Sequence, residues 1–266
     1  MSRVAEAFAK AAAENRAALV GYLPAGFPTQ QGAIDALTAM VRAGVDVIEI
    51  GLPYSDPVLD GPTIQQAADA ALRGGTRIAH VLATVEAVAA TGVATVVMTY
   101  WNPVLRYGVE RFAADLAAAG GAGLITPDLT PDSGPDWLAA SDARDLDRVF
   151  LIAPSSSPER IAMTVAACRG FVYATAVMGV TGARTETSVA APPLVARIRE
   201  VTDLPIGVGL GVSNGTQAAE VAGYADGVIV GSAFVRQLLD APDLAAGVAG
   251  CAELAADLAE GVRRAD

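Results

Sequence analysis

A carboxylate stands inside a strand-like run of β-branched residues near position 49. Residues 47–50 read Val-Ile-Glu-Ile, and the loop that follows carries two further carboxylates, Asp56 and Asp60. Burying an ionised Glu costs several kcal/mol or raises its pKa, so Glu49 needs an explanation. One explanation is an ion pair with a buried Arg or Lys. The other is proton transfer, favoured by a position at the end of a strand beside a polar loop.

Side-chain alternation along this strand predicts a direction for Glu49. Val47 and Glu49 fall on one face, and Ile48 and Ile50 fall on the other. If the isoleucines pack against helices, Glu49 points into an apolar cup, where its pKa should rise towards neutrality. Asp60 lies in a loop long enough to fold back over the same opening, where two carboxylates in unlike environments can divide acid and base roles. Asp60 could equally cap a helix, because Asp-Gly-Pro-Thr is also a helix-start signal.

Short β-branched runs alternate with alanine-rich helical segments along the whole chain. This alternation predicts parallel strands joined by right-handed crossovers. Eight such units in 266 residues match a single (β/α)8 TIM barrel that spans residues 1–266 as one domain. A doubly wound open sheet is the competitor, but no Gly-rich dinucleotide motif follows the first strand. The strands are expected at 18–23, 45–50, 95–100, 123–127, 149–153, 171–176, 205–209 and 227–230, with an extra helix at 2–16 and a short one at 234–239 after the eighth strand.

Composition excludes several classes of function. The net charge is −11, from 18 basic and 29 acidic residues, and no Lys/Arg-rich run occurs, which argues against a nucleic-acid or anionic-membrane partner. No apolar run reaches the length of a membrane span. Cys168 and Cys251 lie far apart and form neither a disulfide framework nor a metal-ligand spacing, which is typical of a reducing cytoplasm.

In a TIM barrel, reactive groups gather where strands end and on the loops that follow. The polar residues at these predicted positions are Tyr22, Glu49, Asp60, Tyr100, Asn102, Asp128, Tyr173, Thr181 and Arg184. Glycines after the seventh strand, at 207–213, and Gly231-Ser232 after the eighth strand predict a phosphate site beside a helix N-terminus. The polar segment 178–191 is expected to be a lid over the barrel mouth, or else a plain surface loop.

The positions of the single histidine and the single lysine exclude several classes of reaction. The single histidine, His80, leads into a helix away from every strand end, so no Ser-His-Asp triad or zinc site is expected. The only lysine, Lys10, falls in the N-terminal helix, which argues against Schiff-base chemistry. The reaction class that remains is acid/base catalysis by carboxylates on a small phosphorylated substrate.

The whole run from Glu49 to Gln65 closely resembles the signature of the tryptophan synthase alpha subunit family. Further matches, in family order and spacing, are Tyr-Trp-Asn-Pro at 100–103, Pro-Asp-Leu at 127–129, Gly-Val-Thr-Gly at 179–182, Gly-Leu-Gly-Val-Ser at 209–213 and Gly-Ser-Ala at 231–233. The resemblance covers essentially the whole chain. It implies a TIM barrel that cleaves indole-3-glycerol phosphate into indole and glyceraldehyde 3-phosphate in a retro-aldol reaction.

The resemblance also implies roles for individual residues. Glu49 would be the general acid and base, and Asp60 would stabilise positive charge on the indole nitrogen. Tyr173 would line the pocket and help to hold Glu49, and Thr181 on the lid would contact Asp60. The remaining substrate-binding residues implied are Tyr22 and Tyr100 at the indole, and Gly182, Gly211, Gly231 and Ser232 at the phosphate.

A beta subunit that carries pyridoxal phosphate is the implied partner, in an alpha2beta2 assembly, whereas the alpha chain itself carries no cofactor and no metal. Positions implied at the contact are Pro53, Asp56, Asn102 and Pro103. The chain departs from the family pattern at 130–134 and 183–187, which leaves lid closure and signalling between subunits open. The alternatives are a stand-alone lyase, a non-catalytic barrel that activates a partner, and an epimerase or isomerase of sugar phosphates.

Overall fold

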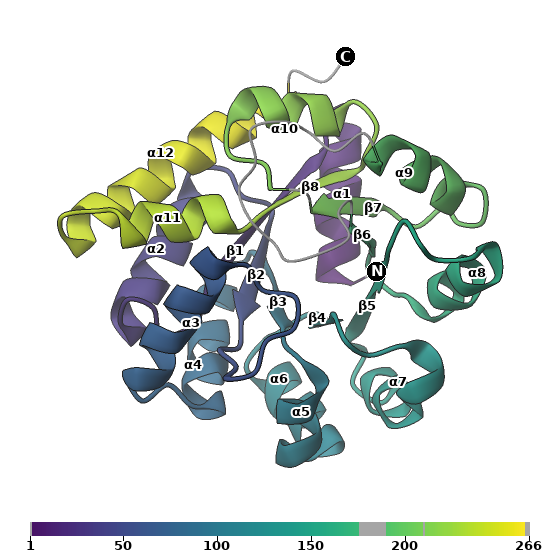
Figure 1. The fold of residues 1–266 in the computed structure, drawn as a ribbon, viewed down its shortest axis with the longest axis horizontal. Helices are drawn as coiled ribbons and strands as arrows, with labels where there is room; N and C mark the ends of the chain where they lie inside the picture. The colour runs from purple at the N-terminus through teal and green to yellow at the C-terminus, as the bar shows by residue number, and fades with distance from the viewer. Residues whose placement is uncertain (1, 176–189, 210, 264–266) are drawn as a thin grey trace.

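Eight parallel strands close into a barrel in the computed structural model, which describes residues 2–175, 190–209 and 211–263 (Figure 1). Each strand pairs with the next in the chain, and β8 returns to pair with β1. The predicted (β/α)8 class is confirmed. The strands are β1 (Ala18–Pro24), β2 (Val47–Gly51), β3 (Ala94–Met98), β4 (Gly123–Thr126), β5 (Asp147–Ile152), β6 (Val172–Thr175), β7 (Ile206–Gly209) and β8 (Gly227–Val230).

Helices surround the barrel, and α11 follows β8 as expected, although it begins earlier than predicted, at Ser232. The helices are α1 (Arg3–Ala13), α2 (Gln30–Arg42), α3 (Pro62–Arg73), α4 (Ile78–Ala89), α5 (Trp101–Tyr107), α6 (Val109–Ala118), α7 (Pro135–Asp142), α8 (Pro158–Ala167), α9 (Ala191–Arg199), α10 (Gly215–Ala222), α11 (Ser232–Leu239) and α12 (Leu244–Arg263), with a 3-10 turn at Pro131–Ser133.

Sequence reasoning predicted no helix over α5 or α7, and it offered a helix start after Asp60 only as an alternative explanation of that residue. A helix, α3, does begin there. Pro62 and Pro135 stand in the first turn of α3 and α7. Proline is well tolerated there, because the N–H groups of the first turn have no partner inside the helix. In a sequence, however, a proline such as Pro135 resembles a turn signal and hides the helix start.

Two apolar layers separate the inside of the barrel from its outside. Ile48 and Ile50 belong to the outer layer, packed with residues of the surrounding helices. Val47 belongs to the inner layer, with residues such as Val20 and Val96 of the neighbouring strands. The predicted alternation along β2 is therefore confirmed, and Glu49 shares the inward face with Val47.

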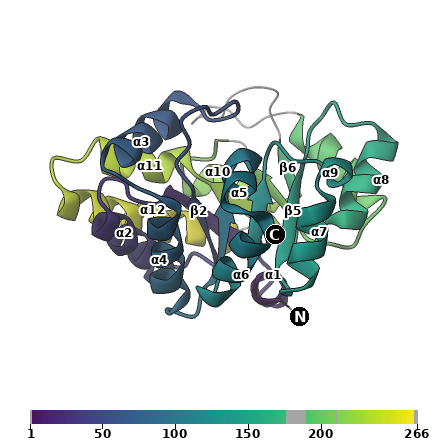
Figure 2. The ribbon, with the colours of Figure 1, turned by 90° about the horizontal axis from the view of Figure 1, so that it is seen from below.

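Helix α1 closes the barrel at the N-terminal ends of the strands. Figure 2 shows it on the opposite side of the barrel from α3 and the loop before α3. Phe8 of α1 stacks on Phe171 with ring centroids 5.2 Å apart, and Phe171 lies 6.4 Å from the ring of Tyr173. Gly227 leaves the space that the Phe8 ring fills, since a Cβ there would meet that ring. An aromatic column thus fills the barrel from α1 up to Tyr173.

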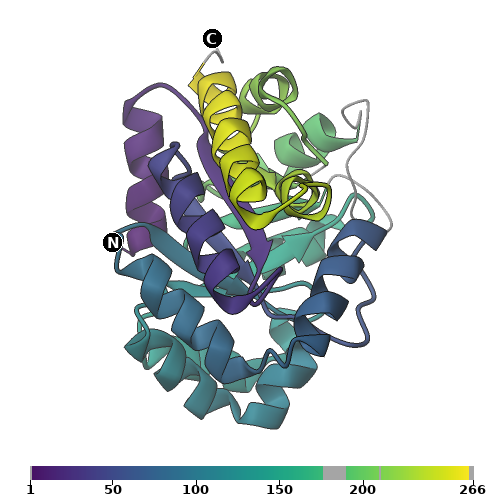
Figure 3. The same cartoon turned by 90° about the vertical axis from the view of Figure 1, so that its left-hand side faces the viewer.

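The last helix seals the outside of β1. Helix α12 lies alongside α2 and α10, as Figure 3 shows for α2. Next to it, the buried guanidinium of Arg16 makes two hydrogen bonds to the Asp46 carboxylate, at 2.6 and 2.9 Å. Within the described ranges, no helix is both long and apolar enough to cross a membrane.

Replacing Phe8 with alanine should destabilise the protein by about 3–5 kcal/mol, because the ring is almost fully buried and its loss leaves a cavity under the barrel. Denaturant unfolding followed by circular dichroism measures the loss. Leu105→Ala is the control, since Leu105 is 56% exposed and should change stability by less than about 0.5 kcal/mol. Equal effects of the two substitutions would contradict the assignment of α1 as a packed plug.

Candidate active site

Glu49 is buried inside the barrel, where the described residues supply no counter-ion. It lies in register with Tyr22 of β1 and Val96 of β3, and it is 1% exposed. It forms no ion pair with any described residue, and its Oε2 has no hydrogen-bond partner among them. Burial, with a smaller contribution from the charge of Asp60, raises the pKa of Glu49 to about 8. The ion-pair explanation of this carboxylate is therefore wrong for the described part of the chain, and the group can hold or release a proton near neutrality.

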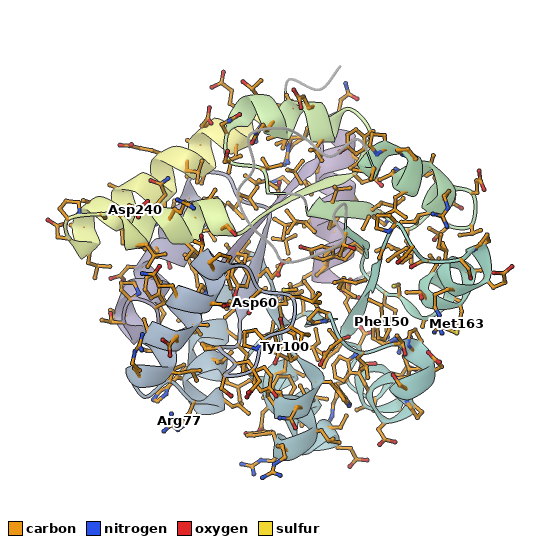
Figure 4. All side chains as sticks on the ribbon, in the orientation of Figure 1. Asp60, Arg77, Tyr100, Phe150, Met163 and Asp240 are labelled. Atoms are coloured by element: carbon orange, nitrogen blue, oxygen red, sulfur yellow. The ribbon has the colours of Figure 1, made fainter. Side chains whose placement is uncertain are left out.

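Asp60 faces the same opening from the loop between β2 and α3. The Tyr100 hydroxyl donates a hydrogen bond of 3.0 Å to Asp60 Oδ1, and Figure 4 shows the two residues close together near the centre of the helix ring. Burial raises the pKa of Asp60, and the hydrogen bond from Tyr100 opposes that rise. Asp60 is not the cap of α3, because Gly61 holds that position. The capping explanation of Asp60 is therefore wrong.

Tyr22 lies against the inner surface of β2, one layer above Glu49. The ideal Cβ position of Gly51 coincides with the end of the Tyr22 ring, so the phenol occupies the space that a side chain at position 51 would need. Gly51 shares the inward face with Glu49 because side chains two residues apart point the same way. Burial raises the pKa of Tyr22, and the charges of Asp60 and Glu49 add to that rise. Tyr22 is therefore close enough to both carboxylates for their charges to act on it.

Tyr173 of β6 completes the inner wall. Burial raises the pKa of Tyr173, and the charge of Glu49 adds to that rise. The ring fills the space that a side chain at Gly209 of β7 would occupy. Thus β7 contributes backbone without side chains on this side, which leaves room for aromatic rings from β6.

The predicted phosphate residues fall at two adjacent strand ends. The β7–β8 register pairs Gly209 with Ile229, so Gly211 and Gly231 come two residues further along neighbouring strands. Gly211 has φ +81°, a conformation that residues with a side chain rarely adopt. Ser232 is buried at the first turn of α11, whose N–H groups lack helical partners. Thr181, Gly182 and Arg184, with most of the predicted lid 178–191, lie outside the described residues.

The start of α5 is fixed by a residue from the next strand. The Trp101 N–H donates to both carboxylate oxygens of Asp128, at 2.9 and 3.1 Å. Asp128, a candidate from its place after β4, therefore satisfies an unpaired donor at the N-terminus of α5. Further along α5, Asn102 Nδ2 donates a 3.0 Å hydrogen bond to the Tyr54 hydroxyl.

Part of the predicted contact surface lines an apolar cavity of about 200 Å³. Pro53 from the loop after β2 and Pro103 from α5 both line it, beside residues of α3 and α4. Val58 and Leu105, which flank these segments, are 69% and 56% exposed. Val58 and Leu105 thus add exposed apolar side chains beside these segments, a feature that is also found at protein interfaces.

His80 has a structural role, as its position in the sequence predicts. The Arg77 N–H donates to His80 Nδ1 at 3.0 Å, at the start of α4. Within the described ranges, no group of three or more His, Cys, Asp or Glu side chains could hold a metal ion.

Sequence reasoning missed Tyr54. Its ring lies against Tyr100 with centroids 5.3 Å apart, and its hydroxyl accepts from Asn102. Tyr54 sits in an irregular loop, where no periodicity predicts the direction of a side chain. The pairing of small residues on β7 with rings on β6 was also missed, although Gly207 and Gly209 two residues apart carry a signal for it.

Comparison with known proteins agrees with this geometry. The family profile described as tryptophan synthase alpha chain matches residues 8–263. The chain belongs to this family. It is 67% identical to the tryptophan synthase alpha chain of Salinispora arenicola over 263 residues, 99% of this chain and 98% of the relative. It is 65% identical to that of Acidothermus cellulolyticus, with 99% and 98% covered. A structure of Mycobacterium tuberculosis tryptophan synthase superimposes with a TM-score of 0.93 at 58% identity, covering 98% of each chain.

Replacing Glu49 with glutamine should stabilise the fold in a pH-dependent way. The folded pKa of Glu49, about 8, exceeds its ordinary value of 4.5, so the native state is penalised increasingly as pH rises from 4.5, and fully above about 8. Glutamine carries no such penalty, so we expect a gain on the order of a few kcal/mol near pH 9 that vanishes near pH 4.5. Urea unfolding of both proteins across this range measures it. A pH-independent difference would show that Glu49 is ionised in the native protein throughout.

Proposed function

We propose that this chain cleaves indole-3-glycerol phosphate to indole and glyceraldehyde 3-phosphate. The observation that carries the proposal is the buried, unpaired Glu49, which faces Asp60 across the barrel mouth and has a pKa raised to about 8. A group with that pKa can act as an acid in one step and as a base in the next. Membership of the tryptophan synthase alpha chain family supports the choice of substrate.

In this reaction Glu49 first gives its proton to the ring carbon of the indole that bears the glycerol phosphate side chain. The ring then carries positive charge at its nitrogen, and the carboxylate of Asp60 stabilises that charge. Glu49, now ionised, takes the proton of the side-chain hydroxyl on the adjacent carbon. The bond between the two carbons breaks, its electrons restore the neutral indole, and the hydroxyl carbon becomes the aldehyde of glyceraldehyde 3-phosphate.

The phosphate is held at the ends of β7 and β8 in this proposal. Backbone N–H groups near Gly211 and Gly231 approach an anion without hindrance from side chains, and the N-terminus of α11 at Ser232 adds partial positive charge. Thr181 and Gly182 are assigned to the same substrate by family resemblance. Tyr22, Tyr100 and Tyr173 then form the walls around the indole.

A beta subunit is the partner that we propose, in an alpha2beta2 assembly that receives the indole. The surface formed by Pro53, Asp56, Asn102 and Pro103 is the proposed contact. Two features support it: Pro53 and Pro103 line one apolar cavity, and the neighbouring Val58 and Leu105 are exposed. The cleavage itself needs no cofactor from this chain, and pyridoxal phosphate would act only on the beta subunit.

The cysteines Cys168 and Cys251 are unpaired, which supports a cytoplasmic location.

Glu49→Gln should abolish most of the activity while substrate still binds. A single proton-transfer group contributes roughly 10²–10⁴-fold to the rate, and Glu49 serves in two steps, so the loss should be at least in this range. Indole release from indole-3-glycerol phosphate, with and without a beta subunit, measures the rate, and calorimetric titration measures binding. Near-normal turnover by the variant would rule out Glu49 as the acid and base. No indole from the unmodified chain under either condition would rule out the reaction.

Gly211→Val should raise KM for the substrate by roughly ten-fold or more, because the side chain blocks close approach of the phosphate to the backbone. Gly75→Val is the matched control: Gly75 also has positive φ, +87°, but no atom lies within 4 Å of its ideal Cβ and it is remote from β7. Gly75→Val therefore introduces the same kind of backbone strain as Gly211→Val but does not touch the proposed phosphate site. Steady-state kinetics of both variants decide the matter, and equal KM values would place the phosphate elsewhere.

A further inference from the structure

Three side chains connect the outer surface of the barrel rim to Asp60. Asn102 Nδ2 donates to the Tyr54 hydroxyl at 3.0 Å, and the Tyr54 ring lies against the Tyr100 ring at 5.3 Å between centroids. The Tyr100 hydroxyl then donates to Asp60 Oδ1 at 3.0 Å. We call this set, Asn102, Tyr54, Tyr100 and Asp60, the rim connection.

Tyr100 is built to fix both the backbone and the side chain near Asp60. Its hydroxyl accepts a 2.9 Å hydrogen bond from the Leu59 N–H while it donates to Asp60. One oxygen therefore holds two neighbouring groups of the loop, and these two contacts together restrict the direction of the carboxylate. The Tyr100 ring is itself anchored, because it is buried and the Trp101 N–H that follows it is bonded to Asp128.

Exposure rises along the rim connection from the active site outwards. Tyr100 is buried, Tyr54 is half-buried, and Asn102 is exposed. Asn102 and Pro53, the neighbour of Tyr54, belong to the proposed contact surface. A protein that docks on this surface would thus touch one end of the rim connection, whose other end is a catalytic carboxylate.

We propose that Tyr100 is a positioning residue for Asp60, and that the Asn102–Tyr54 contact holds Tyr100 in place and links it to the docked partner. The inference rests on the proposed function for its catalytic consequence. Asp60 makes its hydrogen bond to Tyr100 from within the loop, so a partner at the rim can act on it through the two tyrosines without reaching the substrate. When the side chains at the rim are held in place, the carboxylate of Asp60 is held in one direction as well.

Tyr100→Phe removes the hydroxyl and keeps the ring. We expect kcat for indole release to fall roughly ten-fold, the loss expected for a hydrogen bond to a charged group, with KM changed by less than about two-fold. A rise in KM at constant kcat would instead make Tyr100 a substrate-binding residue only, and would overturn the proposal.

The pKa of Asp60 gives a readout that does not depend on activity. The Tyr100 hydroxyl lowers this pKa against the effect of burial, so its removal should raise the pKa further. The other titratable groups that face Asp60, Glu49 and Tyr22, are unchanged in the variant. The Asp60 carboxyl carbon, followed by NMR through a pH titration of the free chain, measures the shift. An unchanged pKa would mean that the hydrogen bond does not hold Asp60 in solution.

Tyr54→Phe and Asn102→Ala test the outer half of the rim connection. Each removes the same hydrogen bond, so each should lower kcat with the beta subunit by about two- to five-fold, and the double variant should be no worse than either alone. Tyr107→Phe is the matched control, because the Tyr107 hydroxyl bonds Asp115 on the same face of the chain, at 2.6 Å, without contact to the rim connection.

The outcomes separate the two proposals. If the unmodified chain releases indole but Tyr54→Phe and Asn102→Ala behave like Tyr107→Phe, the link to the rim is wrong and the proposed function stands. If the unmodified chain releases no indole, the proposed function fails, and the Asp60 titration of Tyr100→Phe still decides whether Tyr100 positions that carboxylate. Additive losses in the double variant would show that Tyr54 and Asn102 act separately, which also overturns the link.

Discussion

A carboxylate with no counter-ion among the described residues, inside an apolar barrel, is the constraint on which the rest of the site depends. Glu49 keeps a raised pKa only while its surroundings stay dry and free of cations, since an arginine nearby would lower the pKa and lock the charge. The inward faces of the strands supply aliphatic and aromatic side chains around Glu49, and α1 closes the far end of the barrel. Burial of Glu49 costs folding free energy, and the apolar packing between the strands and the surrounding helices offsets that cost.

The second carboxylate meets a different environment. Asp60 lies on a loop rather than a strand; burial raises its pKa, and a hydrogen bond from Tyr100 opposes that rise. Two acids of the same chemistry thereby lie in unlike environments, which lets them divide acid and base roles. Tyr22 lies on the inward side of β2, where it has room because Gly51 has no side chain.

The sequence predicted the parts of this site that follow from periodicity. Alternation along β2 was sufficient to point Glu49 inwards, and the count of β/α units was sufficient to predict a closed barrel. It could not predict the contacts of Tyr100 with Asp60 or of Asn102 with Tyr54, which join residues about forty or more positions apart. Such contacts exist because the parallel pairing of β2 with β3 brings the β2–α3 loop beside the start of α5, and no local pattern encodes where an irregular loop folds back.

The interior of the barrel and its rim therefore differ in what fixes the position of a catalytic side chain. Phe8, Phe171 and Tyr173 fill the interior from α1 upwards and leave the reactive groups open only at the rim, on the side of the long loops. The position of Glu49 is set by strand register and is insensitive to events at the surface. The position of Asp60 is set by side-chain contacts between loops, which are fewer and end at an exposed amide. A site with one rigid acid and one adjustable acid can be switched by a partner that never reaches the rigid one.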